Sequence, residues 1–127
     1  MNENDLSKQI VDASYTIHQK LGPGLLESVY EVVLTHELIK QGLHVERQKP
    51  VSIKYDNITF DRAFYTDIIF ENIVIIELKS IETVKPLHKK QLLTYLRLTG
   101  KRLGLLINFG EALIKNGIYR VVNGLPD

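Results

Sequence analysis

The spacing of apolar residues predicts two helices at the start of the chain. Between residues 5 and 21, apolar side chains recur every three or four positions, which indicates an amphipathic helix with Asn4 or Asp5 as its N-cap. The same spacing between residues 25 and 41 predicts a second helix, which Gly42 would end as a C′ residue. The apolar face of this second helix is expected to contain Leu26, Val29, Tyr30, Val33, Leu34 and Leu38.

The middle and the end of the chain carry the patterns of strands and of one further helix. Short β-branched and aromatic runs predict strands over residues 43–48, 51–55, 58–70, 73–80, 103–108 and 118–122. Pro86 fits the first turn of a helix that reaches about Thr99 and is stopped by Gly100. Residues 73–76 are apolar at every position, so this strand is expected to be covered on both faces.

This order of elements predicts a single α/β domain over residues 1–127. Two helices are followed by four strands, a helix and a strand, with a small terminal element. A central mixed sheet flanked by helices is the arrangement that such an order favours. A chain of 127 residues can bury one adequate core, and no repeat, low-complexity tract or linker divides it.

Composition and charge narrow the classes of function. The chain has no cysteine, which excludes disulfides and thiolate metal sites and fits the cytoplasm, and no apolar run is long enough for a membrane span. The net charge of +1 provides no global attraction to nucleic acid, so such binding would need a local patch. One basic cluster without acids consists of Lys85, Lys89, Lys90, Arg97, Lys101 and Arg102. It is either a solvated helix face or a phosphate-binding surface.

The candidate chemistry lies at the end of the buried strand 73–80. Glu77 and Lys79 are two residues apart, so they project from the same face of the strand. A carboxylate in such surroundings is costly unless a cation or strong donors compensate for it. Lys79 alone could do so in a structural ion pair, whereas a metal ion fits better if a second carboxylate converges there. Asp67, on the preceding strand, is the candidate for that second carboxylate.

Whether Asp67 and Glu77 meet depends on the register of the two strands. A two-residue turn at Glu71-Asn72 would place the two acids on opposite faces of the sheet. A three-residue connection or one bulge would pair Asp67 with Glu77 and bring both carboxylates within reach of one ion. Bulges are enriched next to active sites, and we expect this second register.

At these residues the chain resembles the PD-(D/E)xK nuclease superfamily. Asp67 followed by Glu77-Leu78-Lys79 matches the D…(D/E)-x-K core, although Thr66 stands where the superfamily has its named proline. The stretch 24–30, GLLESVY, resembles the signature of the GxxExxY family, and 91–95, QLLTY, is similar to the Q-x-x-x-Y motif of the RecB-like branch. Tyr65 replaces an arginine common in the family. The resemblance implies a restriction-endonuclease-like fold.

The resemblance also implies a role for each motif residue. Asp67, Glu77 and the backbone carbonyl of Leu78 would bind Mg²⁺ (or Mn²⁺), and Glu27 would reach the same ion from its helix, although an acid in a first helical turn also complements the helix dipole. Lys79 would position or deprotonate the attacking water, or stabilise charge at the phosphorus.

The resemblance leaves two readings for the third helix. Gln91 would contact the metal-bound water or a phosphate, with Tyr95 beside it against a base or sugar; alternatively, Gln91 is a surface residue and Tyr95 a core residue. Lys89 and Lys90 are the expected phosphate contacts of this helix.

The resulting expectation is a Mg²⁺-dependent nuclease that hydrolyses phosphodiester bonds of DNA through a metal-activated water. The alternatives are a catalytically silent module of the same fold that binds nucleic acid or a protein, and a structural subunit in which the Glu77–Lys79 pair only sets strand register. Because one small domain offers one site, cutting both strands would need two copies, and a homodimer is expected. No membrane partner is expected.

Overall fold

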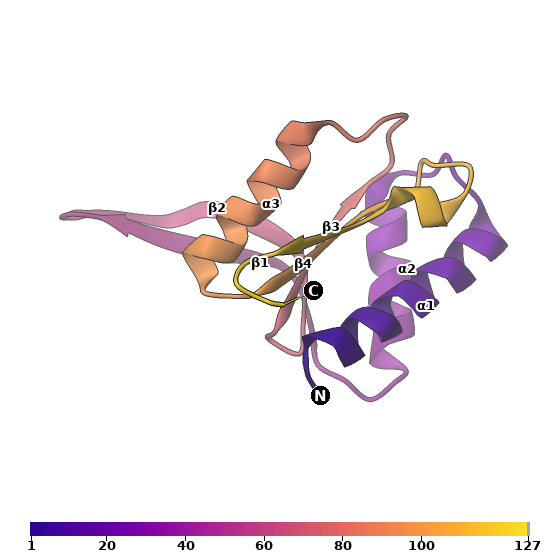
Figure 1. The fold of residues 1–127 in the computed structure, drawn as a ribbon, viewed down its shortest axis with the longest axis horizontal. Helices are drawn as coiled ribbons and strands as arrows, with labels where there is room; N and C mark the ends of the chain where they lie inside the picture. Colours follow the sequence, from indigo (N-terminus) through magenta and orange to yellow (C-terminus); the bar gives the residue numbers. More distant parts are fainter. Residues whose placement is uncertain (127) are drawn as a thin grey trace.

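The computed structural model describes residues 1–126, which form a five-stranded sheet flanked by three helices (Figure 1). In chain order the elements are α1 (Glu3–Leu21), α2 (Glu27–Ile39), β1 (Val45–Tyr55), β2 (Ile58–Phe70), β3 (Val74–Lys79), α3 (Pro86–Thr99), β4 (Leu103–Asn108), the 3₁₀ turn η1 (Ile114–Gly117) and β5 (Ile118–Val122). The strand order is β1-β2-β3-β4-β5, with β3 and β4 parallel and the other neighbours antiparallel. The predicted α/β class with a central mixed sheet is confirmed.

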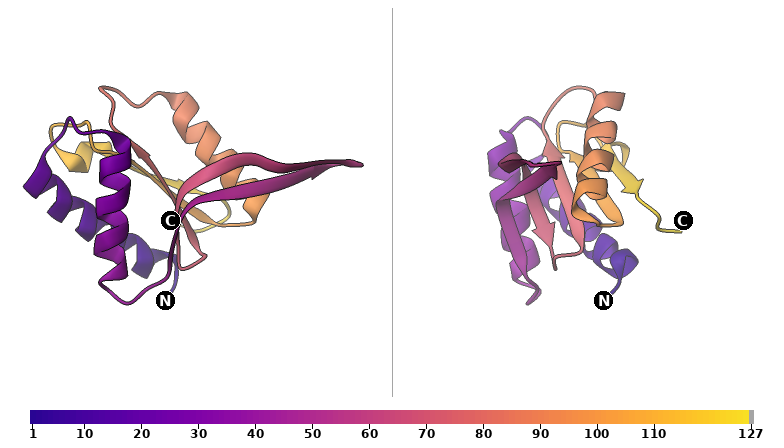
Figure 2. Two further views of the ribbon diagram at one scale, coloured as in Figure 1. Left: turned by 180° about the vertical axis from the view of Figure 1, so that it is seen from behind. Right: turned by 90° about the vertical axis from the view of Figure 1, so that its left-hand side faces the viewer.

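Two separate hydrophobic clusters cover the two faces of the sheet. Helices α1 and α2 pack on the face that carries Ile68 and Ile76, and α3 packs on the face that carries Ile69 and Ile75. Figure 2 shows α2 and α3 on opposite sides of the strands. Strand β3 is therefore covered on both faces, as its continuous apolar run predicts.

The two N-terminal helices differ in detail from the sequence-based prediction. Helix α1 is capped by Asn2, whose side chain accepts the amide of Asp5, rather than by Asn4 or Asp5. The predicted apolar face of α2 is wrong at Leu26 and Val29, which are 73% and 38% exposed. Leu26 precedes the first helical turn as its N-cap, and the face that meets the core is formed by Tyr30, Glu31, Leu34, Thr35 and Leu38. Over residues 1–126, each helix is too short or too polar to pass through a bilayer.

Strands β1 and β2 form a long hairpin that leaves the sheet at its outer end. The two strands predicted over 43–48 and 51–55 are one strand, because Pro50 is tolerated on an edge strand that lacks a second neighbour. The ladder between β2 and β3 spans only Ile68–Phe70 against Val74–Ile76. Beyond it β2 diverges from β3, and the tip of the hairpin projects away from the body (Figure 1). We call the point of divergence the fork.

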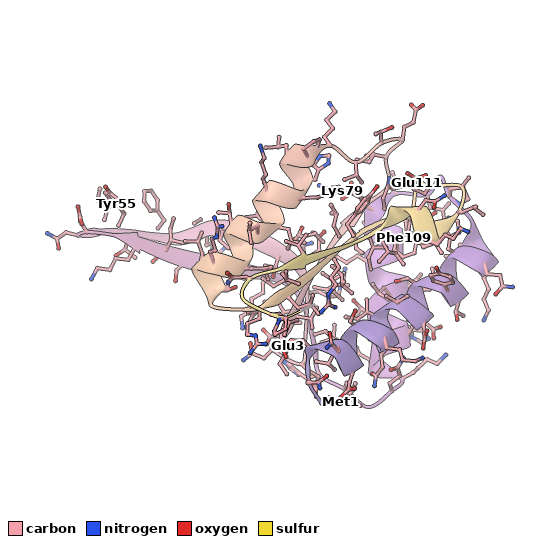
Figure 3. All side chains as sticks on the ribbon, in the orientation of Figure 1. Met1, Glu3, Tyr55, Lys79, Phe109 and Glu111 are labelled. Atoms are coloured by element: carbon pink, nitrogen blue, oxygen red, sulfur yellow. The ribbon has the colours of Figure 1, made fainter. Side chains whose placement is uncertain are left out.

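Asn108, at the end of β4, holds the segment that follows β3. Its side chain is fully buried, its Oδ1 accepts the amides of Ile81 and Gly110 (both 3.0 Å), and its Nδ2 donates to the carbonyl of Ile81 (2.9 Å). This clamp fixes the direction of the chain just after Lys79. Figure 3 shows Lys79 at the same end of the molecule as Phe109 and Glu111, far from Tyr55 at the hairpin tip.

Replacing Asn108 by alanine is expected to lower the free energy of unfolding by about 3 kcal/mol, because three hydrogen bonds are lost and buried backbone groups stay unpaired. Urea unfolding measures this change. The matched control is Asn123→Ala, which removes one half-buried bond to the carbonyl of Lys101 and should cost about 1 kcal/mol. Equal losses in the two variants would contradict a clamp at Asn108.

Candidate functional site at the fork between β2 and β3

The register of β2 and β3 places Asp67 directly opposite Glu77. The last ladder pair is Ile68 with Ile76, and the two acids are the next residues along each strand. The amide of Ile73 donates to the carbonyl of Phe70, which closes a turn over two residues with positive φ, and the ladder begins only at Val74. The connection therefore has three residues, and the register expected for a shared site is confirmed.

Each carboxylate of the fork bonds to the backbone of the opposite strand. The amide of Asp67 donates to Oε1 of Glu77 (3.3 Å), and the amide of Leu78 donates to Oδ2 of Asp67 (2.9 Å). The β2–β3 ladder ends at Ile68 and Ile76, and beyond it these two amides donate to side-chain carboxylates. Both carboxylates are thereby held in the opening between the strands.

The backbone of Leu78 faces the same opening. In a strand, the N–H and C=O of one residue point to the same edge. Since the amide of Leu78 is directed at Asp67, its carbonyl oxygen is directed at the fork as well. The next carbonyl, that of Lys79, faces the other way and accepts the amide of Phe109 (2.8 Å).

Lys79 compensates only part of the negative charge of the two acids at the fork. Burial and the neighbouring Asp67 carboxylate raise the pKa of Glu77 to about 9, and the positive charge of Lys79 opposes this rise only in part. A cation with oxygen ligands would relieve this crowding in place of the proton that the raised pKa retains on Glu77. Two carboxylates and a backbone carbonyl are ligands that Mg²⁺ or Mn²⁺ takes. The donor set at the fork therefore fits a hard divalent cation.

Helix α3 places Tyr95 near the acids and lines a cavity next to Tyr95. Burial raises the pKa of the Tyr95 phenol, and the nearby carboxylates of Glu77 and Asp67 raise it further. The ring of Tyr95 stacks on Phe64 of β2, with centroids 3.9 Å apart and planes at 4°. Gln91, one helical turn earlier, lines a cavity of about 500 Å³ together with Tyr95 and Lys90.

The two lysines expected to contact phosphate point in different directions. Lys90 lines the cavity beside Gln91, whereas the ammonium of Lys89 lies over the ring of Tyr119 on β5, 4.1 Å from its centroid. Successive helical residues are about 100° apart around the axis, so one of the two must turn away. The structure thus brings Lys90, and not Lys89, to the cavity that Gln91 and Tyr95 line.

Glu27 does not join the acid pair. It is exposed in the first turn of α2 and lines a different cavity, of about 490 Å³, with Ser80, Glu82 and Gly110 among its neighbours. Across residues 1–126, no three Asp, Glu, His or Cys side chains lie close enough to hold one ion. The expected convergence of three carboxylates is therefore not met, because α2 begins only at Glu27 and its first residue faces solvent rather than the fork.

A second acid on α2, which the sequence reasoning missed, is connected to the fork. Glu31 is only 6% exposed, and its carboxylate accepts donors from Arg47 and Gln48 of β1. Gln48 also donates to Asp67. An acid flanked by the core residues Tyr30 and Leu34 was a usable signal for Glu31. Gln48 carries no such signal, because only the pairing of β1 with β2 places it near Asp67.

One comparison with known proteins identifies a family. A family model described as the PD-(D/E)XK nuclease superfamily matches residues 4–121, which is nearly the whole chain. The mixed sheet with helices on both faces agrees with the restriction-endonuclease-like fold of that superfamily. Searches among curated proteins and among solved structures returned no match.

Proposed function

The chain belongs to the PD-(D/E)XK nuclease superfamily, and on that premise we propose that it is a Mg²⁺-dependent nuclease that hydrolyses phosphodiester bonds of DNA. Within the superfamily we assign it to the GxxExxY family of the RecB-like branch, because of the motifs at 24–30 and 91–95. The observation that carries the proposal is the pair Asp67 and Glu77, opposite each other in the fork with Lys79 on the same face.

The ligands in this proposal are the carboxylates of Asp67 and Glu77 and the carbonyl of Leu78. A bound Mg²⁺ or Mn²⁺ would supply a water of lowered pKa and would neutralise charge on the phosphate. The acid pair supports this role because the raised pKa of Glu77 indicates poorly compensated negative charge, which a bound cation would neutralise in place of the proton. Glu27 is left out of the ligand set, since it lines a separate cavity.

The remaining groups would hold the substrate and manage protons. Lys79 would orient the attacking water by hydrogen bonding or stabilise the charge that develops on the phosphate oxygens. Gln91 and Lys90 would bind phosphate oxygens from the cavity on the α3 side, which adds sequence-independent affinity. Tyr95 would contact a base or sugar of the substrate. Its stack on Phe64 also packs the hairpin against α3.

The test is cleavage of labelled DNA with Mg²⁺, with Mn²⁺ and with a chelator. The wild-type protein should cut only with metal, and Asp67→Asn should lower the rate at least about 10²-fold because a metal ligand is lost. Asp61→Asn, on the exposed part of the same strand, is the matched control and should keep full activity. Cleavage that survives unchanged in Asp67→Asn would point to a contaminating nuclease and end the proposal.

Substrate and assembly are measured with the same preparation. Matched DNA and RNA strands show which sugar the site accepts, and we propose DNA. A chain with one acid pair cuts one strand in one encounter, so breakage of both strands would require a homodimer. Sedimentation of the protein under assay conditions tests that dimer, and a monomer that breaks both strands in one event would contradict it.

A catalytically silent binding module is the second candidate. It is favoured by the separation of Glu27 from the acid pair and by the net charge of only +1. Isothermal titration distinguishes the two. Binding of Mn²⁺ that is lost in Asp67→Asn supports the nuclease, whereas no binding at millimolar metal supports the module.

A further inference from the structure

A chain of hydrogen bonds runs from the buried acid of α2 to the fork. Oε2 of Glu31 accepts Nε and Nη2 of Arg47 (3.1 and 2.8 Å), and its Oε1 accepts Nε2 of Gln48 (2.7 Å). The same Nε2 of Gln48 lies 3.4 Å from Oδ1 of Asp67. A buried carboxylate with three N–H donors is well compensated, so Glu31 serves as a fixed anchor for the amide of Gln48.

The backbone of Gln48 is in a conformation that its side chain does not favour. Its φ is +48°, in the left-handed region that glycine adopts easily and glutamine rarely. It lies between Arg47 and Lys49, which pair with Ile68 and Thr66, so it stands opposite Asp67 at the sheet edge. Such a conformation persists where surrounding contacts hold it. Here the side chain of Gln48 bonds to Glu31 and to Asp67, the proposed metal ligand.

We propose that Gln48, anchored by Glu31, is a positioning residue that orients the carboxylate of Asp67 for its ligand role. The backbone N–H of Leu78 donates to Oδ2 of Asp67, and the side-chain NH2 of Gln48 donates to Oδ1. Donors on both oxygens fix the plane of the Asp67 carboxylate. Residues that orient a metal ligand in this way contribute to metal affinity without touching the ion. This inference rests on the proposed function, because it concerns the same site.

The test uses the conformation of Gln48 to separate positioning from folding. In Gln48→Gly the bridge is lost and Glu31 loses one donor, but glycine suits the positive φ and offsets this cost, so the urea midpoint should change little. Isothermal titration of Mn²⁺ should show affinity weaker by about 10- to 100-fold. In the cleavage assay, kcat should fall while KM for DNA changes little, because Gln48 acts through Asp67 rather than on the substrate.

Two further variants control for the backbone. Asp56→Gly replaces another residue with positive φ (52°), at the far turn of the hairpin, and should keep the Mn²⁺ affinity of the wild type. Gln48→Leu keeps the size of the side chain, removes its donors and should weaken Mn²⁺ binding as Gln48→Gly does. Loss of Mn²⁺ affinity in Gln48→Gly but not in Gln48→Leu would be caused by a more flexible backbone rather than by the missing side-chain donor. That result would overturn the inference.

The failure of this inference differs from the failure of the proposed function. Wild-type protein that binds Mn²⁺ and cuts DNA, together with a Gln48→Gly variant of equal Mn²⁺ affinity, would overturn the positioning role and leave the nuclease standing. Wild-type protein that binds no Mn²⁺ would overturn both.

Discussion

In a cleavage assay with Mg²⁺, the Lys79→Ala variant is expected to lose about 10²- to 10⁴-fold in rate, the range for removal of a group that transfers or positions a proton. Lys79 shares a strand face with Glu77, and its charge lowers the pKa of that acid, so its ammonium lies close to the acid pair. Metal affinity should persist, because Lys79 donates no ligand. Titration of Mn²⁺ into the variant checks this second point.

Lys115→Ala is the matched control for Lys79→Ala. Lys115 is exposed in η1, on a part of the chain that packs with α1, and its removal should leave the rate unchanged. Two outcomes would contradict the role of Lys79: cleavage at the wild-type rate in Lys79→Ala, or loss of Mn²⁺ binding that accounts for the whole decrease.

With metal chelated, the free energy of unfolding should fall as pH rises. Burial and Asp67 raise the pKa of Glu77 from 4.5 to about 9 in the folded protein. Between these values the unfolded chain has released this proton and the folded chain still holds it. Stability then decreases by up to about 1.4 kcal/mol per pH unit, or about 4 kcal/mol from about pH 5.5 to about pH 8.5. Urea unfolding at a series of pH values measures the slope.

The Glu77→Gln variant should remove most of that slope, because glutamine is neutral at every pH. Glu82→Gln, at an exposed acid, should keep the wild-type slope. Adding Mg²⁺ should raise the stability of the wild type most at alkaline pH, where the ionised acid binds the cation. A wild-type stability that is flat or rising over this range would contradict an uncompensated acid pair.

Several elements follow from local sequence signals. The predicted bounds of β2, α3, β4 and β5 agree with the structure, because apolar patterns and residues typical of turns and helix ends mark them. Pro86 begins α3 with a fixed φ, and Gly100 ends it in the left-handed conformation with φ 68°. Strand β1 was divided wrongly at Pro50, because sequence alone does not say whether a proline lies on an edge strand or a central one.

The candidate site was only partly predictable from sequence. A spacing of two residues places Glu77 and Lys79 on one face of any strand, whatever the rest of the fold does. The pairing of Asp67 with Glu77 could be stated only as a condition on the connection between β2 and β3, and the three-residue connection meets it. Glu27, the acid expected on α2, is exposed, whereas Glu31, one turn later and not considered from the sequence, is buried, and only helix packing distinguishes the two.

By itself, the sequence determined the class of fold, the acid–lysine pattern and the fact that this pair shares one face of β3, because these depend on backbone periodicity and on neighbours along the chain. The tertiary structure decided which groups meet. The rotation of α2 against the core turns Glu31 inward and Glu27 outward, and the edge position of β1 brings Gln48 to Asp67. Contacts between residues far apart in sequence depend on how whole faces pack, and no local pattern encodes that packing.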